Sequence, residues 1–141
     1  MKQSLKLLLL FIVIAVAFFF FTEARGDTTT FIEFGEETLT VTAPQQFSHI
    51  VNYSDIASLE LVELGDLGTI LSGDENRRYS WGARENSIWG RYTLCISKKI
   101  DVAVVVTTSN GEYLVFNYES NDTTEAIHEM FAELLANWTN S

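Results

Sequence analysis

The apolar positions of the chain form three patterns, and the first is an unbroken run near the start. Residues 7–21 (LLLLFIVIAVAFFFF) are all apolar, and Lys2 and Lys6 precede them. A cleaved signal peptide has a basic start, about 7–15 apolar residues and a small-residue cleavage site. A membrane anchor needs about 20 apolar residues, with a lower limit near 17. Residues 5–22 provide 18 positions, which favours an uncleaved anchor. The alternative is cleavage near Ala24, which would give a secreted protein.

The two lysines before this run set the expected orientation in a membrane. The positive-inside rule keeps them on the cytoplasmic side and places residues 25–141 across the membrane. We therefore expect a single-pass protein with a cytoplasmic N-terminus and an extracytoplasmic domain. The predicted organisation is a transmembrane anchor or signal peptide at 1–22, a linker at 23–30, a folded domain at 31–138 and a tail at 139–141.

The second pattern begins after the linker and has a period of two residues, which is typical of strands. It predicts strands at 31–34, 38–42, 47–53, 56–64, 91–97, 101–107 and 112–117. A change of phase near Leu61 indicates a bulge or bend. Asn110-Gly111 lies between the last two strands and predicts a type I′ hairpin. Short turns between consecutive strands predict antiparallel pairing.

The third pattern is a helical stripe at the end of the chain. Asp122 and Glu125 have the spacing of a capping box, and the apolar positions that follow recur every three or four residues. The stripe consists of Ile127, Met130, Phe131, Leu134, Leu135 and Trp138. The expected fold is mainly β, with about seven strands in a bent antiparallel barrel that one C-terminal helix caps.

Several local motifs resemble those of the bacterial pleckstrin-homology-like (PH-like) domains. They are residues 34–41 (FGEETLTV), residues 52–61 (NYSDIASLEL), Gly82 and residues 89–92 (WGRY). The resemblance covers residues 31–138 and implies the bent seven-stranded barrel capped by a helix. It also implies a membrane-tethered interaction or assembly module, not an enzyme. Residues 31–43 contain no Lys or Arg, which argues against phosphoinositide binding at the first two strands.

Charge and composition narrow the classes of partner. The chain has 19 acidic and 9 basic residues and a net charge of −10, which argues against nucleic-acid binding. The single cysteine excludes an intrachain disulfide and a closed cysteine-based zinc site. The acidic pairs at 36–37 and 74–75 lack the ligand spacing of a calcium loop, so we interpret them as solvated turn charges. No metal or cofactor is expected.

Residues suited to catalysis are few. His49 and His128 are the only imidazoles, and Cys95 lies on the strand face opposite Tyr92, Leu94 and Ile96. Nucleophilic catalysis needs a nucleophile beside a base that a third group orients, and no motif of this kind is present. We therefore expect a non-enzymatic protein, with a small exported enzyme as the remote alternative.

The segment 74–92 has the most unusual composition. It contains four of the five arginines together with Tyr and Trp, and these residue types are enriched at interface hot spots. They either pair with the protein's own carboxylates and fill its core, or they form a binding surface for a protein partner or a second copy at the membrane. The alternative ligand, at Arg77, Arg78 and Arg84, is an anionic lipid headgroup or cell-envelope ligand. The candidate surface is Arg77, Arg78, Tyr79, Trp81, Arg84, Trp89 and Arg91.

Overall fold

The computed structural model describes residues 30–139. The predicted anchor and most of the linker, together with residues 140 and 141, lie outside the described residues. Within the described residues, no helix has both the length and the hydropathy to cross a membrane. The elements are β1 (Phe31–Phe34), β2 (Thr38–Ala43), β3 (Phe47–Asn52), η2 (Tyr53–Asp55), β4 (Ile56–Glu63), β5 (Thr69–Ile70), β6 (Asp74–Glu75), β7 (Tyr79–Asn86), β8 (Gly90–Ser97), β9 (Val102–Thr108), β10 (Tyr113–Phe116) and α2 (Asn121–Thr139).

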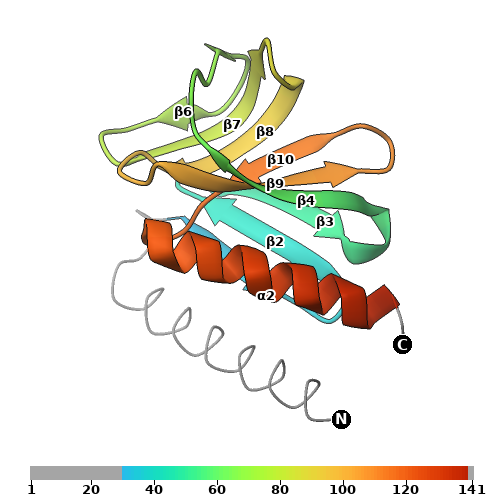
Figure 1. Cartoon of the computed structure of the whole chain (residues 1–141). Coiled ribbons are helices and arrows are strands. Elements are labelled where there is room, and N and C mark those ends of the chain that lie inside the picture. The colour runs from blue at the N-terminus through green and yellow to red at the C-terminus, as the bar shows by residue number, and fades with distance from the viewer. Residues whose placement is uncertain (1–29, 140–141) are drawn as a thin grey trace.

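The strands form two sheets, with the helix packed against them (Figure 1). The smaller sheet is an antiparallel meander in the order β1-β2-β3, and the larger sheet has the order β4-β9-β10-β8-β7-β5, with β6 also paired to β7. In Figure 1 the β7 and β8 end of the larger sheet rises away from α2, whereas β4 and β9 lie near the helix. The expectation of a mainly β fold with one C-terminal helix is confirmed. The described residues contain ten strands, more than the seven expected.

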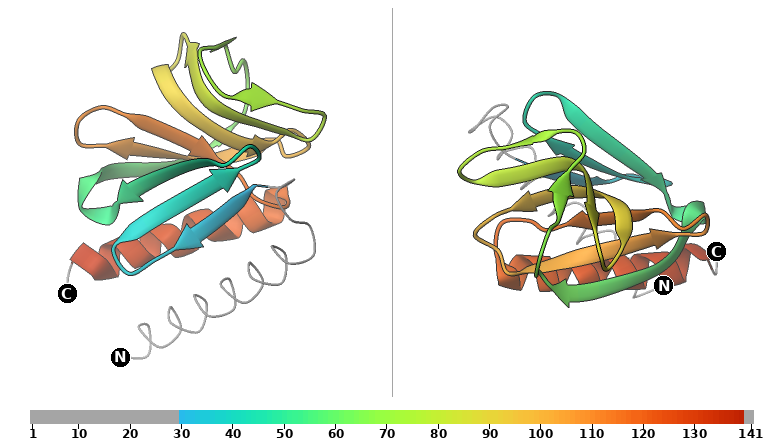
Figure 2. Two further views of the ribbon diagram at one scale, coloured as in Figure 1. Left: turned by 180° about the vertical axis from the view of Figure 1, so that it is seen from behind. Right: turned by 90° about the horizontal axis from the view of Figure 1, so that it is seen from above.

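The apolar stripe of α2 helps to form the main core. Ile127, Met130 and Phe131 are buried, and the stripe packs on residues of both sheets. Phe131 lies edge-on to Phe34 of β1, with 4.9 Å between ring centroids. Figure 2 shows the helix running beside the smaller sheet and the β4 and β9 part of the larger one. The predicted stripe is therefore the packing face of the helix.

A second core lies on the opposite face of the larger sheet. It contains Tyr92, Leu94 and Ile96 of β8 with Val105 and Val115, while Cys95 belongs to the main core. This division confirms the two faces predicted for residues 91–97. Both faces of β9 are buried from residue 103 to residue 106, which explains its unbroken valine-rich sequence.

The predicted pairing of consecutive strands is wrong in two places: β3 and β4 belong to different sheets, and β8 and β9 are not neighbours. β10 lies between them, antiparallel to β9 and parallel to β8. The fully buried Asn117 follows β10, and its side chain joins the ends of the two separated strands. Its Oδ1 accepts from the Ser97 N–H at 2.7 Å, and its Nδ2 donates to the carbonyls of Ser97 and Val102 at 3.3 and 3.2 Å. These bonds satisfy the backbone groups of Ser97 and Val102, which lie at the two ends of the β8–β9 connection.

Three local details also differ from the predictions. The register shift in β4 lies between Ile56 and Ser58, not near Leu61. The β9–β10 hairpin forms, but only Gly111 in its turn has a positive φ, whereas a type I′ turn needs two such residues. Helix α2 is capped by Ser120, whose Oγ accepts from the Thr123 N–H at 3.0 Å. Asp122 lies in the first turn, where the negative charge of a carboxylate interacts favourably with the helix dipole and stabilises the helix.

Candidate binding cleft

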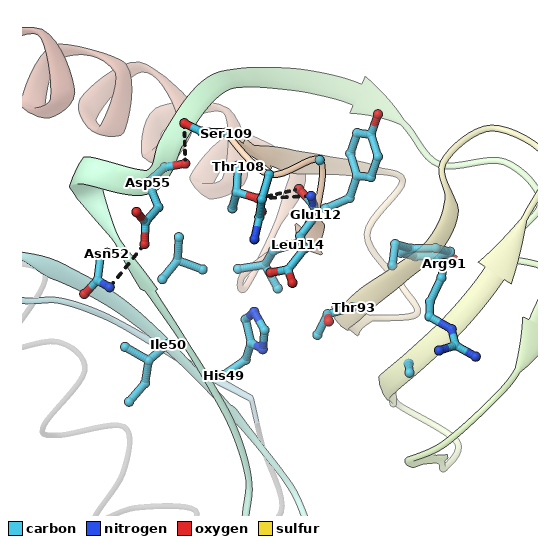
Figure 3. A pocket seen from close by; sticks show the side chains of 16 residues that line it. His49, Ile50, Asn52, Asp55, Arg91, Thr93, Thr108, Ser109, Glu112 and Leu114 are labelled. Carbon is cyan, nitrogen blue, oxygen red and sulfur yellow. Dashed lines mark hydrogen bonds between the residues drawn. The ribbon is translucent and has the colours of Figure 1, made fainter.

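A cleft of about 550 Å³ lies between the smaller and the larger sheet, and no residue of α2 lines it. This volume is within the range of ligand sites, about 300–1,000 Å³. One wall is β3, and the other is β8 together with the β9–β10 hairpin (Figure 3). The lining comprises residues 49–52, 55, 83, 91–93 and 108–114.

The β3 wall is an edge strand whose outer side has no strand partner among residues 30–139. All six of its residues pair in regular register with β2 on the other side. The N–H of Tyr53 donates to the carbonyl of Glu37 at 2.9 Å, and hydrogen-bonded pairs alternate along an antiparallel ladder. Val51, His49 and Phe47 therefore direct their backbone groups toward β2. Ser48, Ile50 and Asn52 direct theirs toward the open edge.

This edge lacks the usual protection against pairing with another chain. Proteins protect exposed edges with charged side chains, prolines, bulges or very short strands. At the edges of the larger sheet, β4 has a register shift and two glutamates, and β5 has only two residues. β3 (FSHIVN) has no bulge, no proline and no Asp, Glu, Lys or Arg. Its Ile50 is 62% exposed.

His49 and Glu112 point toward each other across the cleft. Figure 3 shows the His49 ring directed into the cleft from β3, with the Glu112 side chain directed toward it from the hairpin. Burial lowers the pKa of His49 below its usual 6.5, and the negative charge of Glu112 partly opposes this shift. His49 is therefore neutral at pH 7, and Glu112 contributes a negative charge to the cleft.

One end of the cleft is closed by hydrogen bonds between η2 and the hairpin. The carbonyl of Asp55 accepts from the N–H of Ser109 at 2.7 Å and from its Oγ at 3.3 Å. The Asp55 carboxylate accepts from Asn52 Nδ2 at 3.2 Å. These contacts hold the two walls together at this end.

The residues predicted as an interaction surface are not all exposed. Trp81 is 3% exposed and belongs to the main core, and Arg84 is 5% exposed. Tyr79 and Trp89 are half-buried against the two cores. Arg77, Arg78 and Arg91 are exposed, and only Arg91 lies at the cleft.

Arg84 pairs with one of the protein's own carboxylates, in line with one of the two interpretations. Its Nη2 lies 3.2 Å from Glu75 Oε2 and also donates to Ser80 Oγ. Lys98 Nζ lies 3.3 Å from the same Glu75 oxygen, and the two cations lower the pKa of Glu75, with the Lys98 hydrogen bond the larger cause. Within the described residues, Arg77, Arg78 and Arg91 make no salt bridge.

The residues weighed for catalysis or metal binding are dispersed. Cys95 is fully buried, and burial raises the pKa of its thiol to about 12, so it stays protonated. His128 is half-buried on α2. Within residues 30–139, no three His, Cys, Asp or Glu side chains are grouped so as to hold a metal ion.

Sequence reasoning did not associate His49 with Glu112. They lie in different sheets, and only the long-range arrangement of β3 and the hairpin brings them together. The available signal was the absence of charge in β3, which is unusual for a strand at an edge. Comparison of the chain with protein-family models, curated proteins and solved structures finds no match.

Proposed function

We propose that the chain is a non-enzymatic, membrane-tethered interaction module of PH-like type that binds a protein partner through the cleft beside β3. Residues 5–22 would hold it in the membrane, with the domain on the outer side. The observation that carries this proposal is the unpaired, uncharged edge of β3, which opens onto a cleft with a second wall. Tethering raises the local concentration at the membrane, so a weak contact suffices.

The environments of Cys95 and His49 support binding over catalysis. The thiol of Cys95 is buried in the main core and stays protonated, which excludes it as an accessible nucleophile. His49 is bordered by the acidic Glu112 and by the apolar side chain of Leu114. A large exposed isoleucine beside open backbone groups is suited to contact with another polypeptide.

A second candidate ligand is an anionic lipid headgroup or cell-envelope polymer, held by Arg77 and Arg78. Both are exposed and make no salt bridge with the described residues. Arg84 was the third residue of this expected site, but it is buried and paired with Glu75. Binding at the two remaining arginines would fall steeply with salt and would be lost in the double variant Arg77→Glu, Arg78→Glu.

Site-specific photocrosslinking in native membranes tests the cleft. A photoreactive residue replaces Ile50 in the full-length protein, and the control carries it at Ile88, which is equally exposed at 65% but lies outside the cleft. We expect a protein adduct from position 50 that is absent from position 88. Equal adducts at both positions, or none at position 50, would contradict a protein-binding cleft.

A further inference from the structure

We infer that the cleft binds an extended segment of another protein as an added strand on β3, and that this segment carries a basic side chain that contacts Glu112. The inference rests on the proposed function and specifies the chemistry of the partner. Strand addition to a sheet edge is a known mode of peptide recognition, in which main-chain hydrogen bonds give affinity and side-chain contacts give specificity.

The backbone of β3 provides the template. The N–H and C=O groups of Ser48, Ile50 and Asn52 face the open edge, as the ladder with β2 requires. A strand rises about 3.3 Å per residue, so the six residues of β3 offer about 20 Å of edge. A bound segment would bond to these three residues and leave the pairing of His49 and Val51 with β2 intact.

The second wall of the cleft distinguishes this site from a strand edge that faces only solvent. β8 and the hairpin face β3 across the cleft, so side chains of an added strand would contact protein on both sides. Ile50 offers an apolar contact beside the open edge, where it is 62% exposed.

Charge identifies the class of partner. Residues 30–139 contain 17 acidic and 6 basic residues, a net charge of −11. Glu112 and Asp55 line the cleft, and the one Arg in its lining, Arg91, extends away from His49 and Glu112 in Figure 3. Since His49 is neutral at pH 7, the cleft favours Lys or Arg over Asp or Glu. A second copy of the domain brings the same net negative charge and is disfavoured.

The test uses the full-length chain in non-ionic detergent micelles and two synthetic probes. One probe is a capped eight-residue peptide of alternating valine and lysine, and the other has glutamate in place of each lysine. Titration calorimetry measures affinity, and NMR hydrogen exchange measures protection of each β3 amide.

We expect the lysine peptide to bind at least about tenfold more tightly than the glutamate peptide. The amides of Ser48, Ile50 and Asn52 should exchange more slowly in the complex, while those of His49 and Val51 stay as they were. Glu112→Gln, on an exposed loop residue, should reduce the preference between the two peptides. Ile50→Pro should lower the affinity for the lysine peptide by about tenfold or more, because it removes an N–H that faces the open edge.

Several results would overturn strand addition. They are protection of other amides, equal affinity for the two peptides, or no binding of the lysine peptide. A doubled mass in light scattering, with the three amides protected in the absence of peptide, would identify a second copy as the occupant. An adduct from Ile50 in membranes combined with any of these results would leave the protein-binding role standing and reject only this mode of binding.

Discussion

β7 and β3 each pair along their whole length with one neighbouring strand, β8 and β2 respectively, and their outer sides differ. The outer side of β7 is covered by the chain segment 65–78, through β5 and β6. The outer side of β3 has no strand partner among the described residues. The covered edge needs glycines and the buried Arg84, which pairs with Glu75, whereas the open edge consists of ordinary strand residues. The protein therefore closes one edge through specific local packing and leaves the other open to a cleft.

The largest expected effect concerns the covered edge, where the backbone of segment 65–78 packs directly against the backbone of β7. Gly82 has φ +108°, and a Cβ there would lie 2.4 Å from the Ser72 carbonyl oxygen and 2.6 Å from Gly73 Cα. Gly82→Ala should lower the free energy of unfolding by at least about 3 kcal/mol, since neither backbone can move away cheaply. Urea unfolding followed by tryptophan fluorescence measures this loss.

Gly90→Ala is the matched control for that substitution. Gly90 also has a positive φ, +69°, but no heavy atom lies within 4 Å of the added Cβ. It should cost only about 1 kcal/mol, from the backbone conformation alone. Equal losses in the two variants would show that the close packing of segment 65–78 on β7 adds nothing to the loss of unfolding free energy in Gly82→Ala.

A proline pair tests the direction assigned to the backbone of β3. His49→Pro removes an N–H that faces β2, and its ring obstructs that pairing, so we expect a loss of about 3 kcal/mol. Ile50→Pro removes an N–H that faces the open edge, so we expect about 1 kcal/mol or less. Urea unfolding of both variants gives the comparison. The reverse order would mean that the open and paired residues of β3 are wrongly assigned.

These particular residues show which parts of the molecule local sequence can predict. The stripe of α2 and the two faces of β8 are periodic patterns within one element, and both are confirmed. The position of β10 between β8 and β9 is a long-range arrangement, which the bonds of Asn117 to Ser97 and Val102 accompany, and no local pattern contains it. Trp81 and Arg84 had the composition of a binding surface, but they lie on a strand that segment 65–78 covers.

The candidate cleft was beyond sequence analysis for the same reason. The absence of charged residues in β3 was visible, but its place at an edge depends on the order of the sheets. His49 and Glu112 each looked ordinary in their own segments. They come together through the arrangement of the two sheets, which the hydrogen bonds between Asp55 of η2 and Ser109 of the hairpin help to hold.

The covered edge should lose a stabilising contact in acid. The pKa of Glu75 is held below its usual 4.5, first by the hydrogen bond from Lys98 and then by Arg84. Its stabilisation is complete above about pH 4.5 and is lost as the pH falls through the lowered pKa. Glu75→Gln should therefore flatten the fall in urea midpoint in this acidic range. An equally steep fall in the variant and in the wild type would contradict this role of Glu75.

The smallest expected effect concerns the open edge, and its pH range is different. Burial holds the pKa of His49 below the unfolded value of 6.5, against the opposing charge of Glu112. As the pH falls from about 6.5 toward the lowered pKa, the unfolded chain binds the proton first, so stability declines. His49→Gln should remove this part of the decline in urea midpoint. Protonation of His49 would also offset the charge of Glu112, so the lysine peptide should bind more weakly to the wild-type protein in that range. A peptide affinity independent of pH in the wild type would mean that His49 does not lie beside the bound segment.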